Sequence, residues 1–313
     1  MTARLTRRLC NRAAACGLTV LGLLLAHLPA GAAGAPGEVA EAVPEATHWW
    51  VRAPADMAVA YRGMPEFEGA GLNTAPMMYV APGGLIGLLA AVAVHGAISD
   101  SVLSGQKDKI REEADKVLVP YQAVLQRVTH RVLIERALPK VAHGASRAFI
   151  DAGEALPDAW VIESTPVFMI TRDHRALVLD NAIVVKGPGS PAVRYQGLVR
   201  VVASPRTLAT EPADLPHPWL ADDGRLLAEE SSSLFAESLD IVLAELAKGP
   251  RAAEPTQKTV RYAEGGLDRM ERGTLLVDGC DRVLLKTLRG GLMSVPRRAP
   301  TCKAPQAAVA KEG

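Results

Sequence analysis

The sequence has few aromatic residues and no surplus of charge of either sign. Phe, Trp and Tyr make up 4% of the 313 residues, so the core must rest mainly on Leu, Val, Ile and Ala. Lys and Arg number 35 against 34 Asp and Glu, which gives a formal net charge of +1. Because proteins that bind a phosphate backbone carry a positive surplus, this balance excludes nucleic acid as an expected partner.

Motifs that carry well-known chemistry are missing too. No Gly-x-x-x-x-Gly-Lys-Ser/Thr loop is present to cradle phosphates, so nucleotide hydrolysis is not expected. The histidines are scattered, and none belongs to a His-Glu-x-x-His motif of the kind that holds zinc. The sequence therefore assigns no cofactor, no metal ligand and no catalytic residue, and an enzymatic role is not favoured.

The amino terminus has the pattern of a signal peptide. Residues 1–12 carry four arginines and no acidic residue, and an apolar run follows over residues 13–29. Ala30-Gly31-Ala32 then supplies the small residues that a signal peptidase requires before its cleavage point. We expect residues 1–32 to be removed by cleavage after Ala32, which would place the mature chain in the periplasm or cell envelope.

Cleavage would leave only Cys280 and Cys302 of the four cysteines. In an oxidising compartment this pair predicts a disulfide that ties the carboxy-terminal tail to the folded body. Two unpaired thiols remain the alternative, because the sequence does not show that the two Cα atoms come within bonding reach.

Residues 80–99 are the strongest apolar signal outside the leader, because they contain no charged side chain. Gly83, Gly87 and Ala91 recur at every fourth position, which on a helix forms a shallow groove that a second helix can approach closely. Two interpretations stay open: a helix buried in the core, and a helix that contacts a membrane or a partner helix through residues 83–98. As an alternative localisation, residues 80–99 would anchor a single-pass membrane protein, although the helix expected over residues 85–98 is short for a bilayer core of about 30 Å.

Two segments carry a resemblance. The run Pro82–Leu89, followed by small residues and then by a charged helix, resembles the glycine-zipper segment of uncharacterised exported envelope proteins from Gram-negative bacteria. Residues 261–296 are similar to the carboxy-terminal part of such proteins. The resemblance implies an envelope location and carries no assigned chemistry.

The rest of the chain divides by composition and by period. Residues 33–79 are rich in Pro and Ala and predict an extended lead segment, and residues 80–150 predict the apolar helix followed by amphipathic helices. Residues 151–296 predict an α+β domain, and residues 297–313 predict a mobile tail. The predicted fold class is α+β: an antiparallel sheet packed with amphipathic helices, plus the apolar small-residue helix.

Within residues 151–296, short β-branched runs alternate with turn residues. The short spacings favour antiparallel hairpins, because parallel strands need crossovers of a dozen or more residues. A helix is expected over residues 226–246, where apolar residues recur along one side: Phe235, Leu239, Val242 and Leu246. Residues 231–233, three serines, are interpreted as its solvent face, and Asp278-Gly279 predicts a type I′ turn between two further strands.

Two short motifs invite a catalytic interpretation. Residues 144–148 are similar to a serine nucleophile elbow around Ser146, but the preceding residues continue a predicted helix where that device needs a strand. Asp173-His174 could set a carboxylate beside an imidazole base, although these residues also have the composition of a polar hairpin turn.

The function expected from the sequence is that of an exported envelope protein with a structural or binding role. It would associate with a membrane or a partner helix through residues 83–98. The alternative is a periplasmic hydrolase whose site is assembled from dispersed residues, with His174 as the candidate base. A small-molecule ligand stays unassigned.

Overall fold

The computed structural model describes residues 42–43, 47–54, 57–66, 101–154, 158–188, 192–206, 217–248 and 256–298. Several predictions fall outside these residues and stay predictions. They concern the signal peptide, the apolar helix with Gly83, Gly87 and Ala91, the partner Cys302 of the expected disulfide, and nearly all of the tail.

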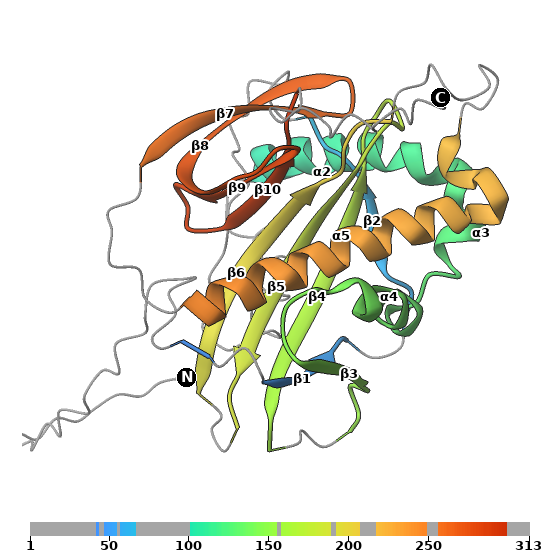
Figure 1. The fold of residues 1–313 in the computed structure, drawn as a ribbon. Coiled ribbons are helices and arrows are strands. Elements are labelled where there is room, and N and C mark those ends of the chain that lie inside the picture. The colour runs from blue at the N-terminus through green and yellow to red at the C-terminus, as the bar shows by residue number, and fades with distance from the viewer. Residues whose placement is uncertain are drawn as a thin grey trace, which may run out of the picture. The chain divides into compact units, whose positions relative to one another are not determined.

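The described residues form a mixed fold in which strands dominate: one ten-stranded, mostly antiparallel sheet with helices beside it (Figure 1). At its centre β4 (Trp160–Ile170), β5 (Leu177–Lys186) and β6 (Val193–Val202) run antiparallel. Beyond β6 lie β10 (Leu292–Pro296), β9 (Arg282–Thr287), β8 (Leu267–Asp278) and β7 (Gln257–Glu264). On the other side of the centre lie β1 (His48–Arg52), β2 (Ala60–Gly63) and β3 (Ser146–Ile150).

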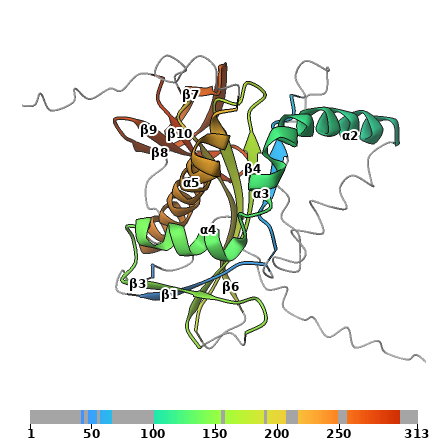
Figure 2. The ribbon, with the colours of Figure 1, turned by 90° about the vertical axis from the view of Figure 1, so that its right-hand side faces the viewer.

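The described helices fall into two stretches of the chain. The first contains α2 (Ser101–Asp115), η2 (Lys116–Tyr121), α3 (Gln122–Leu125), α4 (His130–Ala137) and η3 (Leu138–Lys140). The second contains η5 (Pro218–Leu220) and α5 (Ala221–Lys248). The long helix α5 crosses one face of the central strands and contacts β5 and β6 (Figure 2).

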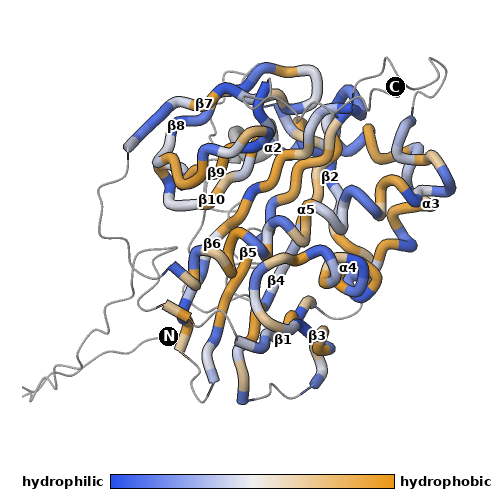
Figure 3. Tube along the Cα trace, viewed as in Figure 1, coloured by the Kyte–Doolittle hydropathy of each residue, from blue (hydrophilic) through white to orange (hydrophobic). Residues whose placement is uncertain are grey.

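The two faces of the central strands pack against different partners. Successive residues of a strand point to opposite faces. On β6, Val199 and Val201 therefore belong to the large core that includes Phe235 and Val242 of α5, whereas Val202 belongs to a second cluster shared with β7, β9 and β10. Figure 3 shows the long hydrophobic stretches of β4, β5 and β6 from which both clusters are built.

A chain of hydrogen bonds joins β4, β5 and α5 inside the core. Ser164 Oγ donates to Asn181 Oδ1 at 2.7 Å, and Asn181 Nδ2 donates to Ser238 Oγ at 2.9 Å. All three side chains are fully buried. Because a buried polar group without a partner costs about 1–3 kcal/mol, this network favours one position of α5 on the sheet over its neighbours.

The prediction that the serines 231–233 lie on the solvent face of α5 is wrong for two of the three. Ser231 and Ser232 are fully buried, while Ser233 is exposed. Tyr61 of β2 shares a hydrogen bond of 2.8 Å with Ser231, and the Lys140 ammonium donates to Ser232 at 2.7 Å. Segments distant in sequence thus cover a polar stretch of helix that local patterning assigns to water.

Several predicted strands merge into longer ones. The two runs around Pro166 form the single strand β4, although proline cannot donate to a ladder. Along the other edge of β4, β1 pairs up to Glu163 and β2 pairs from Val167, so Pro166 lies in the gap between these two partners. The missing N–H therefore interrupts no ladder with either strand.

Three local expectations need correction. The extended lead segment is partly sheet, because β1 and β2 both pair in parallel with β4. Residues 146–150, expected to be helical, form the strand β3, which pairs with β1. Finally, Gly279 is not among the glycines with positive φ, so the turn from Asp278 to Arg282 is not type I′, and a bulge in β8 accommodates it instead.

Candidate functional site

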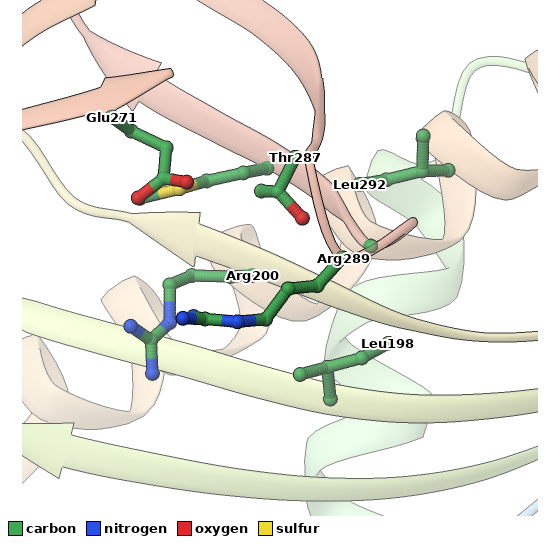
Figure 4. Close-up of a pocket in the computed structure, with 8 residues that line it drawn as sticks. Leu198, Arg200, Glu271, Thr287, Arg289 and Leu292 are labelled. Atoms are coloured by element: carbon green, nitrogen blue, oxygen red, sulfur yellow. The ribbon is translucent and has the colours of Figure 1, made fainter. Parts of the chain in front are cut away.

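A pocket lies where β6 meets the three strands β8, β9 and β10 (Figure 4). It is a shallow recess of about 420 Å³ that is partly open to solvent. It is lined by Leu198, Arg200, Glu271, Thr287, Arg289, Gly291, Leu292 and Met293.

Strand alternation explains why Arg200 faces this pocket. Its neighbours Val199 and Val201 point into the core beneath α5, so Arg200 points to the opposite face. There it is directly opposite Asp180 of β5 and donates to both carboxylate oxygens, from Nε and from Nη2, at 2.6 Å each. Burial opposes the charge of Arg200, but the Asp180 carboxylate outweighs it and keeps the pKa of the guanidinium above its usual value.

The paired Arg200 still has hydrogen-bonding capacity. Both bonds to Asp180 leave Nη1 without a hydrogen-bond partner among the described residues. Because the ion pair is itself neutral, Arg200 offers a ligand a directed donor rather than a net positive charge.

Glu271 and Arg289 complete the charged part of the pocket. Within the described part of the chain, the Glu271 carboxylate has no hydrogen bond, and burial raises its pKa while the nearby Arg289 and Arg200 partly oppose that rise. Arg289 is exposed on the turn between β9 and β10. Gly290 closes this turn with φ 88°, a conformation that favours glycine, and Thr287 donates its N–H to the Gly291 carbonyl at 2.8 Å.

The polar and apolar side chains of the pocket are separated. Figure 4 shows the end groups of Glu271, Arg200 and Arg289 gathered at one end, while Leu198 lies at the other. Such a site can hold the charged end of a small molecule beside the carboxylate and the guanidinium groups, and its hydrocarbon part against Leu198.

His174 lies on the β4–β5 turn, as expected, but its side chain contacts other residues than the sequence suggests. Its Nδ1 shares a hydrogen bond of 2.8 Å with the hydroxyl of Tyr121, which is fully buried. The His217 ring lies edge-on at 5.3 Å between centroids. His174 also has φ 58°, which is rare for a non-glycine residue.

The Asp173 carboxylate has no hydrogen bond to the His174 ring. It accepts from the Thr171 hydroxyl at 2.6 Å and from the Gly266 N–H at 2.5 Å, which fixes the turn rather than the imidazole. Burial lowers the pKa of His174, with a further lowering from His217. The geometry expected of an aspartate-oriented general base is therefore not assembled by Asp173 and His174.

A serine and a histidine meet at the other end of the sheet. Ser146 begins β3 and is hydrogen-bonded through Oγ to His48 Nδ1 of β1, with both residues exposed. The carboxylate of Asp240 is bonded to His143 instead, at 3.1 Å. Sequence patterning missed this pair because His48 and Ser146 are 98 positions apart and only the parallel pairing of β1 with β3 brings them together.

Comparison of the chain with family models, with curated proteins and with solved structures finds no match. Among the described residues, no helix is long and apolar enough to cross a membrane, and no three His, Cys, Asp or Glu side chains are grouped to hold a metal ion. The resemblance to exported envelope proteins stays a prediction.

Sequence analysis assigned no binding role to the residues that line the pocket, although most of them lie in the segment 261–296 that carries the resemblance. Arg200, Glu271 and Arg289 come from β6, β8 and the β9–β10 turn, and no motif joins them. One signal was readable in the sequence: Arg200 stands alone among valines and leucines in a strand pattern, a position where a charge needs a buried partner.

Proposed function

We propose that this chain is an exported binding protein of the cell envelope and that the pocket between β6 and β8–β10 is its binding site. The carrying observation is the pocket's pair of unsatisfied charged groups: the Glu271 carboxylate and Arg200 Nη1 have no hydrogen-bond partner among the described residues. Neither group is among the fully buried side-chain atoms without a partner, so both reach solvent in the recess and are accessible to a ligand that would replace water there.

The pocket's chemistry favours binding over catalysis. Arg200 is held by two hydrogen bonds to Asp180, and the hydroxyl and carboxylate of the lining, those of Thr287 and Glu271, are not joined by a hydrogen bond in the described structure. The described groups can orient a ligand through charge and shape. This supports the binding role expected from the sequence.

A ligand screen tests the proposed binding site. The protein recovered after export would be mixed with small molecules that carry both charged and apolar groups, and its melting temperature compared with that of the variant Leu198→Trp, which fills the pocket. A compound that stabilises the wild-type protein but not the filled variant supports the proposal. Equal stabilisation of both proteins, or of neither by any compound, contradicts it.

The attachment of residues 83–98 to a membrane or a partner helix is a separate part of the proposal. Gly87→Leu would place a bulky side chain in the small-residue groove and is expected to reduce the cross-linked species that this helix forms with a partner helix. Ala93→Leu, on another face of the predicted helix, is the matched control and is expected to leave the cross-linked species unchanged. Unchanged association of the Gly87 variant would count against the groove.

The second candidate function, a hydrolase, rests on a different observation from the one foreseen. The hydrogen bond between Ser146 and His48 is the kind of contact by which a base activates a serine, although the described structure places no carboxylate on His48. Labelling by a fluorophosphonate probe that disappears in Ser146→Ala would favour the hydrolase. An unlabelled wild-type protein would remove it.

A further inference from the structure

The last strand of the sheet has one edge without a described partner. β7 ends the strand order, and among the described residues only β8 pairs with it (Figure 1). Leu275 donates its N–H to the Thr256 carbonyl at 3.2 Å, and these two residues continue the register of β7 and β8. Because hydrogen-bonded pairs alternate along an antiparallel ladder, the even-numbered residues of β7 bond to β8. The backbone N–H and C=O groups of the odd-numbered residues therefore point to the free edge, and these residues are Gln257, Thr259, Arg261 and Ala263.

The side chains beside this edge are exposed, and two of them are guanidinium groups. Thr259 and Arg261 are exposed on β7, and Met270 and Arg272 are exposed on β8. Arg261 lies opposite Met270, and Thr259 lies opposite Arg272, so the two arginines are diagonal neighbours on one face. Arg272 donates to Gln257 Oε1 at 3.4 Å, and within the described part of the chain neither arginine has an ion pair with a carboxylate.

The carboxylates nearest to this face have partners of their own. Asp268 pairs with Arg298 at 3.2 Å, and Asp278 lies 3.9 Å from the Lys258 ammonium. Glu271 lines the pocket on the opposite face of β8. The face of Arg261 and Arg272 therefore keeps an excess of positive charge beside a row of unpaired backbone groups.

A second copy of β7 fits this edge poorly. It would bring another Lys258 and another Arg261 to the same edge, and like charges across a strand pair are destabilising. Cationic side chains protect many edge strands from self-association in this way. The same charges attract a strand that carries carboxylates.

We infer that the free edge of β7 binds an extended acidic segment of a partner protein, which adds an antiparallel strand to the sheet. Residues directly opposite each other in an antiparallel pair share a face, and every second pair exchanges hydrogen bonds. Partner residues opposite Thr259 and Arg261 would therefore exchange hydrogen bonds with β7 and carry the acidic side chains. This surface adds a protein partner to the small-ligand binding proposed for the pocket.

A synthetic peptide tests the match of charge. The probe is a fluorescein-labelled peptide of about eight residues in which Glu and Val alternate, titrated with the full exported protein and followed by fluorescence anisotropy. It is expected to bind in a saturable manner. The matched peptide in which Lys replaces Glu is expected to bind at least about tenfold more weakly, because its side chains meet the arginines with like charge.

Two methylated peptides test the addition of a strand. N-methylation of the Glu residues removes the N–H groups that would face β7, whereas N-methylation of the Val residues removes those that would point to solvent. The first is expected to weaken binding at least about tenfold, and the second to stay within about threefold of the unmodified peptide. Equal affinities of the two methylated peptides would overturn strand addition, and a loss confined to the Val-methylated peptide would overturn the antiparallel arrangement.

A variant assigns the binding to this edge. Arg261→Gln is expected to weaken binding of the Glu–Val peptide about threefold, as for an exposed ion pair. Arg111→Gln is the control, because Arg111 is exposed on α2 and pairs with Asp108, and its affinity should match the wild type. Unchanged affinity in Arg261→Gln, or no saturable binding of the Glu–Val peptide, overturns the inference. A dimer in sedimentation velocity that excludes the peptide would show that a second copy occupies the edge, and would overturn it as well.

Discussion

The ion pair between Asp180 and Arg200 can be tested by the substitution Asp180→Asn. Asparagine keeps the size of the side chain but removes its charge and replaces one accepting oxygen by a donating NH₂, so one of the two 2.6 Å hydrogen bonds is lost. Breaking a fully buried pair costs about 3–5 kcal/mol, because the remaining charge is left without compensation. The side chains of Arg200 and Asp180 are 17% and 22% exposed, so solvent reduces the expected loss to about 2–4 kcal/mol.

Urea unfolding followed by far-UV circular dichroism measures this loss. The variants Asp180→Asn, Arg200→Gln and the double variant form a cycle, and the coupling energy between the two sites is expected to be about 2 kcal/mol. Asp108→Asn is the control, because Asp108 pairs with Arg111 on the surface of α2 with more than half of each side chain exposed. It should change the free energy of unfolding by less than about 1 kcal/mol. Additive losses in the cycle would refute the reasoning.

The remaining predictions concern the pH dependence of stability and a tight backbone turn. Because burial lowers the pKa of His174 in the fold, the unfolded chain takes up a proton first, so the free energy of unfolding should fall as pH drops below about 6.5. His174→Asn, which tolerates positive φ, should flatten that fall in urea titrations at several pH values; an unchanged slope would contradict the assigned burial. Gly224→Ala should destabilise by about 2–3 kcal/mol, because Gly224 has φ 82° and an added Cβ would lie 2.0 Å from Val124 Cγ1. Gly105→Ala, with nothing within 4 Å, should instead stabilise α2 by up to about 1 kcal/mol, and equal melting temperatures for the two variants would contradict the packing at Gly224.

The central sheet and the long helix were predictable from local patterns. β-branched runs predicted β4, β5 and β6 and their antiparallel order, and the recurring Phe235, Leu239, Val242 and Leu246 predicted α5, where all four are buried. Both signals work because they depend on residues close together in the sequence. The strand β1 carries no comparable signal: its five residues follow a Pro- and Ala-rich stretch, and its pairing with β3 and β4 depends on segments about a hundred positions away.

The candidate site was not predictable from the sequence for the same reason. Arg200 and Glu271 lie 71 positions apart, and they meet only because β8, β9 and β10 extend the sheet beyond β6. His174 shows the opposite case. Its turn was predicted correctly, but its contacts with Tyr121 and His217 come from η2 and from the residue before η5, which local composition does not reveal.

Methyl NMR of selectively labelled methionine tests the binding pocket most directly. The Met293 side chain lines the pocket and is 3% exposed, whereas Met270 is 64% exposed and not part of the lining. The methyl resonance of Met293, assigned by its disappearance in Met293→Leu, should shift in a saturable manner on titration with a compound that stabilises the wild-type protein but not Leu198→Trp, while that of Met270 should stay in place. A Met293 resonance that does not move, or that moves together with Met270, would contradict a binding site between β6 and β10.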